Sequence, residues 1–271
     1  MTFSIKKNKN SRLFFNYLNI KVDITNIELS NKKLHTSQKI KVIHLSDLHC
    51  KAFGEDQNYI LSKIESFNPD LVVFTGDLID GRSSSKNYKH SYKLMKGLTK
   101  YHPVYYVTGN HEYYSNNAYE IKSKLIDIGV SVLNDEHTTL SIKDTIINIY
   151  GLDDGKLNKI FLEDKLREIT KDMDNNNLNI LLSHKPELFD TYSKFNFDFI
   201  FSGHAHGGQF RIPFTNQGLI APGQGLFPKL TEGTHTLNNS TLIVSRGLGN
   251  SLFPFRLFNQ SEIVALTIKG K

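Results

Sequence analysis

Residues 71–77 have the sequence LVVFTGD, in which four consecutive apolar residues are followed by a threonine, a glycine and an acid. A short, wholly apolar run predicts a strand buried on both faces. Strands are also predicted at residues 40–45 (IKVIHL), 104–107 (VYYV), 178–182 (LNILL) and 197–201 (FDFIF), which are mainly apolar. Helical patterns stand between them at residues 57–67, 88–99, 117–128, 158–173 and 186–195. This alternation predicts an α/β protein with a mixed sheet or two packed sheets.

The two ends of the chain carry a different pattern. Residues 19–29 (NIKVDITNIEL) alternate apolar and polar residues, which predicts a half-buried antiparallel strand. Residues 130–133 and 145–150 also have strand character, and Gly129 is expected to end the preceding helix. After residue 207 the chain is rich in Gly, Pro and aromatic residues, with strands near 241–245 and 262–268. Because no linker-like stretch interrupts the chain, we expect residues 1–271 to form one domain.

The composition excludes several classes of protein. Of the 271 residues, 39% are hydrophobic and 22% are charged, which is incompatible with intrinsic disorder. The single cysteine, Cys50, excludes a disulfide framework and a thiolate zinc site. Eleven histidines offer ligands for a metal centre built from nitrogen and oxygen.

The net charge of +6 is concentrated near the start of the chain, where residues 1–41 carry nine Lys and Arg against two acids. Residues 1–18 form a basic and apolar N-terminal extension that is too short to span a membrane and lacks a secretory core. We therefore expect a cytoplasmic protein. The extension is either solvated or in peripheral contact with an anionic membrane surface. No basic–aromatic motif is present, so no nucleic-acid partner is expected.

Polar residues suited to metal binding follow five of the predicted strands. They are Asp47 and His49 after residues 40–45, Asp77 after 71–74, Asn110 and His111 after 104–107, His184 after 178–182, and His204 and His206 after 197–201. Ligand sites in α/β sheets gather at the carboxyl ends of strands, so these side chains should converge.

The residue types define the chemistry of such a site. Two carboxylates, one amide oxygen and four imidazoles suit Mn²⁺ foremost, with Zn²⁺, Fe²⁺ or Co²⁺ as other candidates. Seven ligands exceed one tetrahedral site and fit two divalent ions that share a carboxylate. Such a pair activates a water and holds the attacking and leaving oxygens of a displacement at phosphorus.

The ordered set Asp-x-His, Gly-Asp, Gly-Asn-His-Glu, His and Gly-His-x-His resembles the calcineurin-like metallophosphoesterase superfamily. Residues 43–49 (IHLSDLH), 203–213 (GHAHGGQFRIP), 245–249 (SRGLG) and 262–264 (EIV) resemble its bacterial phosphodiesterase branch, which includes UDP-2,3-diacylglucosamine pyrophosphatase-like proteins. The resemblance implies a two-sheet α/β/β/α sandwich.

The resemblance also implies a role for each residue. Asp47, His49 and His206 would bind the first metal, Asn110, His184 and His204 the second, and Asp77 both. His111 would protonate the leaving oxygen or stabilise charge on the phosphoryl group. Glu112 would orient His111 or, as the favoured reading, cap a helix. Asp80 replaces the tyrosine of the coloured iron phosphatases, which argues against an iron site of that kind.

The late part of the chain supplies candidates for substrate binding. Arg246 and Arg211 lie among glycines, and a guanidinium suits phosphate oxygens. The apolar residues Leu226, Phe227 and 252–255 (LFPF) are either core or a rim for an acyl chain.

The leading hypothesis is a metal-dependent phosphohydrolase, most readily a phosphodiesterase. A metal-bridging hydroxide would attack a phosphodiester, a diphosphate or a phosphomonoester. Two alternatives are kept: a nuclease acting on nucleic acid, and a non-catalytic metal-binding scaffold.

Overall fold

The computed structural model describes residues 21–83, 85–156, 159–215, 217–250, 253 and 255–271. These residues form two six-stranded sheets and a short hairpin. The first sheet has the order β1 (Val22–Asn31), β14 (Ser261–Gly270), β2 (Lys39–Leu45), β3 (Leu71–Thr75), β4 (Val104–Val107) and β5 (Ser131–Val132). The second has the order β12 (Gly233–Leu237), β13 (Ser240–Val244), β9 (Phe199–Ser202), β8 (Leu178–Leu182), β7 (Thr145–Gly151) and β6 (Glu136–Ile142).

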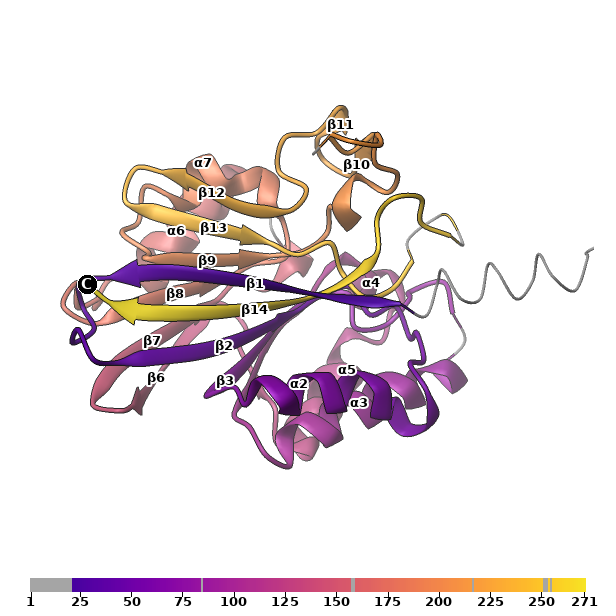
Figure 1. Cartoon of the computed structure of the whole chain (residues 1–271), viewed down its shortest axis with the longest axis horizontal. Coiled ribbons are helices and arrows are strands. Elements are labelled where there is room, and N and C mark those ends of the chain that lie inside the picture. Colours follow the sequence, from indigo (N-terminus) through magenta and orange to yellow (C-terminus); the bar gives the residue numbers. More distant parts are fainter. Residues whose placement is uncertain (1–20, 84, 157–158, 216, 251–252, 254) are drawn as a thin grey trace, which may run out of the picture.

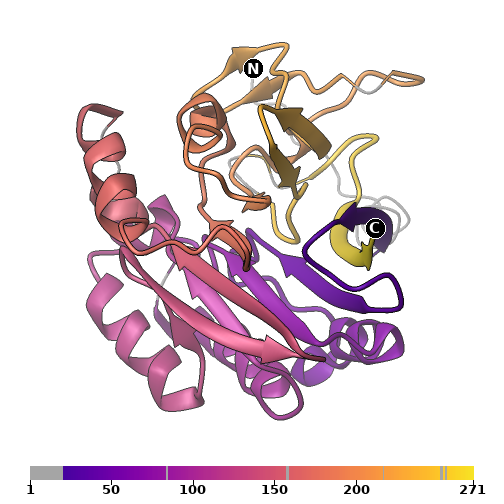
Figure 2. The ribbon, with the colours of Figure 1, turned by 90° about the vertical axis from the view of Figure 1, so that its left-hand side faces the viewer.

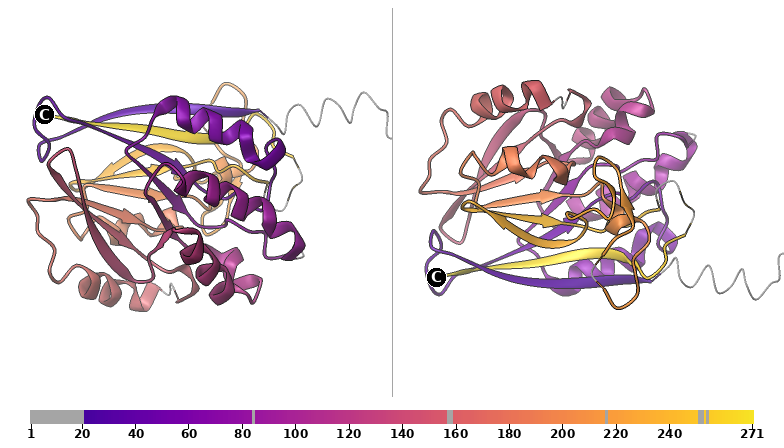
Figure 3. Two further views of the ribbon diagram at one scale, coloured as in Figure 1. Left: turned by 90° about the horizontal axis from the view of Figure 1, so that it is seen from below. Right: turned by 90° about the horizontal axis from the view of Figure 1, so that it is seen from above.

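Helices cover the outer face of each sheet. Helices α2 (Asn58–Phe67), α3 (Lys89–Thr99) and α5 (Ala118–Ile128) lie on one side of the strands. Helices α6 (Lys159–Ile169) and α7 (Phe189–Tyr192) lie on the other side. In Figure 3, α2 and α3 lie in front of the strands in the view from below, and α7 does so in the view from above. The predicted α/β/β/α sandwich is therefore confirmed (Figures 1 and 2).

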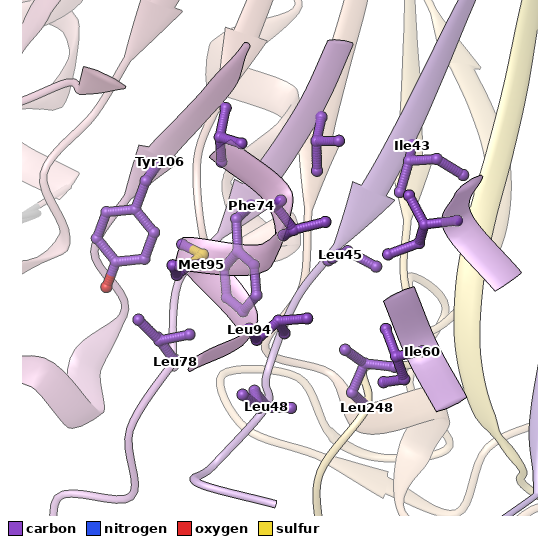
Figure 4. Close-up of a cluster of buried hydrophobic side chains, with 14 of the residues drawn as sticks. Ile43, Leu45, Leu48, Ile60, Phe74, Leu78, Leu94, Met95, Tyr106 and Leu248 are labelled. Carbon is purple, nitrogen blue, oxygen red and sulfur yellow. The ribbon is translucent and has the colours of Figure 1, made fainter. Parts of the chain in front are cut away.

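Alternation along each strand divides the core into layers. In β2, Ile43 and Leu45 face the helices, whereas Ile40 and Val42 face the second sheet. Figure 4 shows Ile43, Leu45 and Phe74 from the first sheet against Ile60, Leu94 and Met95 from the helices. Each sheet is thus buried on both faces, which is why its central strands are almost wholly apolar.

One strand prediction was wrong. β1 pairs with β14 in parallel, from Val22 with Ser261 to Asn31 with Gly270, and not in an antiparallel arrangement. Alternating burial reports that one face of a strand is covered, but it does not report the direction of the neighbouring strand. The turn at Gly129 is confirmed, since this glycine ends α5 with φ +96°.

Some predictions fall outside the described residues, namely the N-terminal extension 1–18 and the apolar positions Leu252 and Pro254. Among the residues that are described, no helix combines the length and the apolar character that crossing a membrane requires.

Candidate metal centre

The loops after β2, β3, β4, β8 and β9 meet at one end of the sandwich. Backbone hydrogen bonds connect them: Asp47 N donates to Gly76 O (2.9 Å), His49 N to Asp77 O (3.1 Å) and Gly203 N to His184 O (3.1 Å). Because parallel strands end at the same edge, the two sheets present their carboxyl ends together. The convergence expected from the sequence is present in the structure.

One group of side chains comprises Asp47, His49, Asp77 and His206, all buried, with one potential ligand atom from each within 4.8 Å of the others. The Nε2 atoms of His49 and His206 lie 3.2 Å apart. Nε2 of His206 is 3.3 Å from Asp47 Oδ1, and Nε2 of His49 is 3.6 Å from Asp77 Oδ2. Nitrogen and oxygen atoms therefore face a common point.

A second group comprises Asp77, His184 and His204. Nε2 of His184 lies 3.3 Å from Asp77 Oδ2 and 3.0 Å from His204 Nδ1. Asp77 belongs to both groups, which is the position that a bridging carboxylate requires. Asn110 begins the short helix α4 (Asn110–Tyr114), and its buried Oδ1 has no hydrogen-bond partner among the described residues.

The ring of His184 is oriented by the backbone. Its Nδ1 lies 2.7 Å from the carbonyl oxygen of Thr75, to which it donates a hydrogen bond. This bond directs Nε2 at Asp77 and His204, the orientation that a metal-binding imidazole needs. Burial lowers the pKa of His184, but the charge of Asp77 and the hydrogen bond to it outweigh burial and raise that pKa well above its ordinary value.

Burial sets the charge of the site. It lowers the pKa of His49 and of His204 to about 3, and it keeps the pKa of His206 well below its ordinary value. Burial, reinforced by the charge of Asp77, raises the pKa of Asp47 to about 6. Three imidazoles held neutral by burial and two crowded carboxylates fit divalent cations, because a cation between the carboxylates would offset their negative charge.

The backbone at these residues is unusual. Five of the seven candidate ligands have positive φ: Asp47 (53°), His49 (48°), Asp77 (53°), His204 (65°) and His206 (48°). Such left-handed geometry is uncommon outside glycine and clusters at functional sites. The chain turns sharply after each strand so that these side chains point inward.

Glu112 holds two of the loops together. Its buried carboxylate accepts hydrogen bonds from Gly109 N (2.7 Å), Asp77 N (3.0 Å) and Ile79 N (3.2 Å). The bond from Gly109 caps α4, as the sequence favoured. The other two bonds fix the loop that carries Asp77, a role that the sequence did not predict.

His111 lies at the edge of the two groups and lines a cavity of about 440 Å³ together with Lys185, Glu187 and Tyr114. Its Nδ1 lies 3.3 Å from Asp80 Oδ1 and 3.1 Å from Gly81 N, which donates to this nitrogen when the ring is neutral. Burial lowers the pKa of His111, but the hydrogen bond to Asp80 and the charge of Asp77 outweigh it and raise that pKa. From the sequence, Asp80 argues only against an iron site, and its contact with His111 was not predicted.

The two arginines expected at a substrate anion lie in an ion-pair cluster. Arg211 pairs with Glu232 and donates to Gly207 O (3.1 Å). Arg246 pairs with Glu262 (3.1 Å) and lies 3.6 Å from Glu232. The structure does not bring either arginine into the lining of the 440 Å³ cavity, as far as the described residues define it, whereas Lys185 does line it.

Comparisons with known proteins agree with this geometry. The model of the calcineurin-like phosphoesterase family matches residues 40–208. The chain is 29% identical over 239 residues to the uncharacterized metallophosphoesterase YkuE of Bacillus subtilis (strain 168), covering 87% of this chain and 81% of that protein. It is 31% identical over 251 residues to an uncharacterized metallophosphoesterase of Aquifex aeolicus (strain VF5), covering 90% of each.

A solved structure shares the fold. The NAD nucleotidase NadN of Haemophilus influenzae superposes with a TM-score of 0.53 at 18% identity, over 78% of this chain and 45% of that one. At this identity the likeness concerns the fold alone.

Proposed function

The chain belongs to the calcineurin-like phosphoesterase family, and from this premise we propose that it hydrolyses phosphodiesters at a centre of two divalent metal ions. Family membership and the cluster of ligand-type side chains support metal-dependent phosphoester hydrolysis. The number of ions, the identity of the metal and the preference for diesters are the proposed part.

The sharing of Asp77 between two ligand groups carries the proposal of two ions. Asp47, His49 and His206 would hold one ion, and Asn110, His184 and His204 would hold the other. When bound, two such ions supply a water that is acidic enough to act at neutral pH and positive charge for the phosphoryl oxygens. The mixed nitrogen and oxygen donor set favours Mn²⁺, with Zn²⁺, Fe²⁺ or Co²⁺ as alternatives.

We assign His111 to proton transfer. The ring borders the cavity, and its centroid lies 4.5 Å from that of His49, so it faces the space beside the ligand groups. The contact between Nδ1 and Asp80 fixes the ring and stabilises its protonated form. From this position His111 would donate a proton to the leaving oxygen of the substrate.

The charged side chains around the cavity favour a phosphodiester over a phosphomonoester as the substrate. Glu187 lines the cavity with its Oε1 4.0 Å from His204 Nε2, and Lys185 is paired with Asp154 at 3.1 Å. Burial raises the pKa of Glu187, and in its ionised form this carboxylate repels the dianion of a phosphomonoester more than the monoanion of a diester. The proposal therefore ranks diesters above monoesters.

The test uses the full chain with Mn²⁺ and compares bis(4-nitrophenyl) phosphate, 4-nitrophenyl phosphate and a nucleotide-diphosphate lipid. The diester should be hydrolysed fastest, with two bound ions per chain by elemental analysis. Asp77→Asn should lose both ions and at least about a hundredfold in kcat. The exposed Asp127→Asn serves as the matched control. Full activity in Asp77→Asn, or one ion per wild-type chain, would contradict the two-ion proposal.

A further inference from the structure

A second cavity adjoins the metal centre. It has a volume of about 360 Å³, and its walls include Ile220, Ala221 and Phe253. His206, Pro222 and Gly223 line both this cavity and the one at the metal centre. The two cavities therefore lie side by side.

The walls of the second cavity are fixed by the fold. Ile220 pairs with Leu226 across the short hairpin of β10 (Ile220–Ala221) and β11 (Gly225–Leu226), which lies beyond the ends of β9 and β13 (Figure 1). The ring of Phe253, which also lines the cavity, packs on that of Phe210, with centroids 5.0 Å apart. The backbone N of Arg211 donates to Leu257 O (3.1 Å), which ties these two segments together.

The lining of this cavity is apolar. Among the described lining residues, the polar side chains are the His206 ring and Gln209, whose amide donates to Phe255 O. Ile220 and Phe253 are each 43% exposed, and Leu226, which pairs with Ile220 across the hairpin, is 67% exposed. Exposed apolar side chains gathered around one hollow indicate a binding surface.

We propose that this cavity binds the alkyl chain of an amphiphilic phosphoester whose phosphate lies at the metal centre, an inference that rests on the proposed function. The apolar walls decide the chemistry of the occupant. A sugar or a nucleobase would leave polar atoms without partners there, which costs about 1–3 kcal/mol for each group. An alkyl chain has no polar atoms to satisfy and covers the exposed faces of Ile220 and Phe253.

Binding of n-alkylphosphonates tests the proposal without turnover. Methyl-, butyl- and hexylphosphonate are titrated into the full-length, Mn²⁺-loaded protein by calorimetry. Each buried methylene should lower Kd about fourfold, so that Kd falls about fifteenfold for every two methylenes. Equal Kd values for methyl- and hexylphosphonate would overturn the proposal, and this result is also expected if another segment of the chain fills the cavity.

Two variants locate the effect. Ile220→Asp places a charge in the wall, and Phe253→Ser removes a ring in an irregular loop without touching the candidate ligands. In both, the gain from methyl- to hexylphosphonate should shrink to less than about threefold, with unchanged Kd for methylphosphonate. Ile146→Asp is the matched control, because Ile146 is 47% exposed on β7 of the second sheet. An undiminished gain in both Ile220→Asp and Phe253→Ser would overturn the assignment to this cavity.

A hydrolysis assay distinguishes a failure of this inference from a failure of the proposed function on which it rests. The same series as alkyl 4-nitrophenyl phosphodiesters should show kcat/KM rising with chain length. Tighter binding of long phosphonates without hydrolysis of any ester would retain the apolar subsite and contradict the phosphodiesterase proposal. Hydrolysis of the methyl diester with no effect of chain length would retain the phosphodiesterase proposal and contradict the apolar subsite.

Discussion

Gly109 lies directly against Asp77. A Cβ atom on Gly109 would stand 2.3 Å from Asp77 Oδ1 and 2.6 Å from its backbone N, closer than real Cβ atoms approach. The φ angle of Gly109 is −110°, so the glycine is needed for space and not for backbone conformation. The carboxylate of Asp77, which both ligand groups share, can therefore take its position only because residue 109 has no side chain.

Replacing this glycine should displace the shared carboxylate. We expect Gly109→Ala to fold but to lose at least about tenfold in kcat and part of its bound metal, because misplaced ligands weaken metal sites. Diester hydrolysis and elemental analysis provide the measurements. Gly233→Asn is a suitable control, since a Cβ there meets open space and Asn tolerates its φ of +72°. Normal kcat and metal content in Gly109→Ala would disprove the steric role.

Glu112 should matter for stability as well as for activity. Glu112→Ala would leave the backbone N–H groups of Asp77, Ile79 and Gly109 without their acceptor. Because these groups are buried, we expect the free energy of unfolding to fall by about 2–5 kcal/mol. Urea unfolding in the presence of a chelator measures this loss apart from metal binding. Glu112→Gln keeps one acceptor oxygen and should lose less; equal losses in the two variants would contradict the explanation.

Asp80 should act through His111. Asp80→Asn removes the charge that faces Nδ1 of the ring, and we expect kcat to fall about ten- to hundredfold with unchanged metal content. In a double-mutant cycle, Asp80→Asn should cost little once His111→Ala is present. Asp56→Asn, at an exposed carboxylate paired with Lys93, is the control. Additive effects of Asp80→Asn and His111→Ala would show that Asp80 acts independently.

His44 should make stability depend on pH. This buried side chain contacts Thr75 Oγ1 (2.8 Å), and burial lowers its pKa to about 3. The ordinary value in the unfolded chain is about 6.5, so the unfolded state binds the proton more tightly. The contribution of His44 to stability is therefore complete above pH 6.5 and is lost, at about 1.4 kcal/mol per pH unit, as the pH falls toward 3.

His44→Phe keeps a ring in this position and removes the titration. In chelator, we expect the wild type to lose stability more steeply than His44→Phe between pH 6.5 and 4.5, although the variant starts lower because Thr75 loses its partner. Urea unfolding at several pH values gives both slopes. Parallel slopes would refute the assignment to His44.

The sequence predicted the central strands well because burial on both faces leaves an unmistakable apolar run. β4 and β8 have the predicted bounds. Weakly patterned elements were missed: β6 is a mostly polar edge strand, and α4 is a five-residue helix of polar and aromatic residues. For β1 the half-buried alternation was visible, but its parallel pairing depends on β14, which is more than two hundred residues away.

The candidate site, like the fold, could be predicted from the sequence only in part. Side chains placed by strand ends could be gathered from the sequence, since topology alone brings them together. The contact between Asp80 and His111 depends on the path of an irregular loop, and the pairing of Arg211 with Glu232 depends on two loops meeting. Periodicity and motif spacing carry no information on such contacts.

The left-handed backbone at five candidate ligands has a consequence for the life of the protein in a cell. Each such residue costs of order 1 kcal/mol that the surrounding fold must outweigh, and bound ions would stabilise the folded form further by mass action. Chains made when metal is scarce would then open more often and be degraded sooner. The abundance of this protein would follow the metal supply of the cell even under constant synthesis.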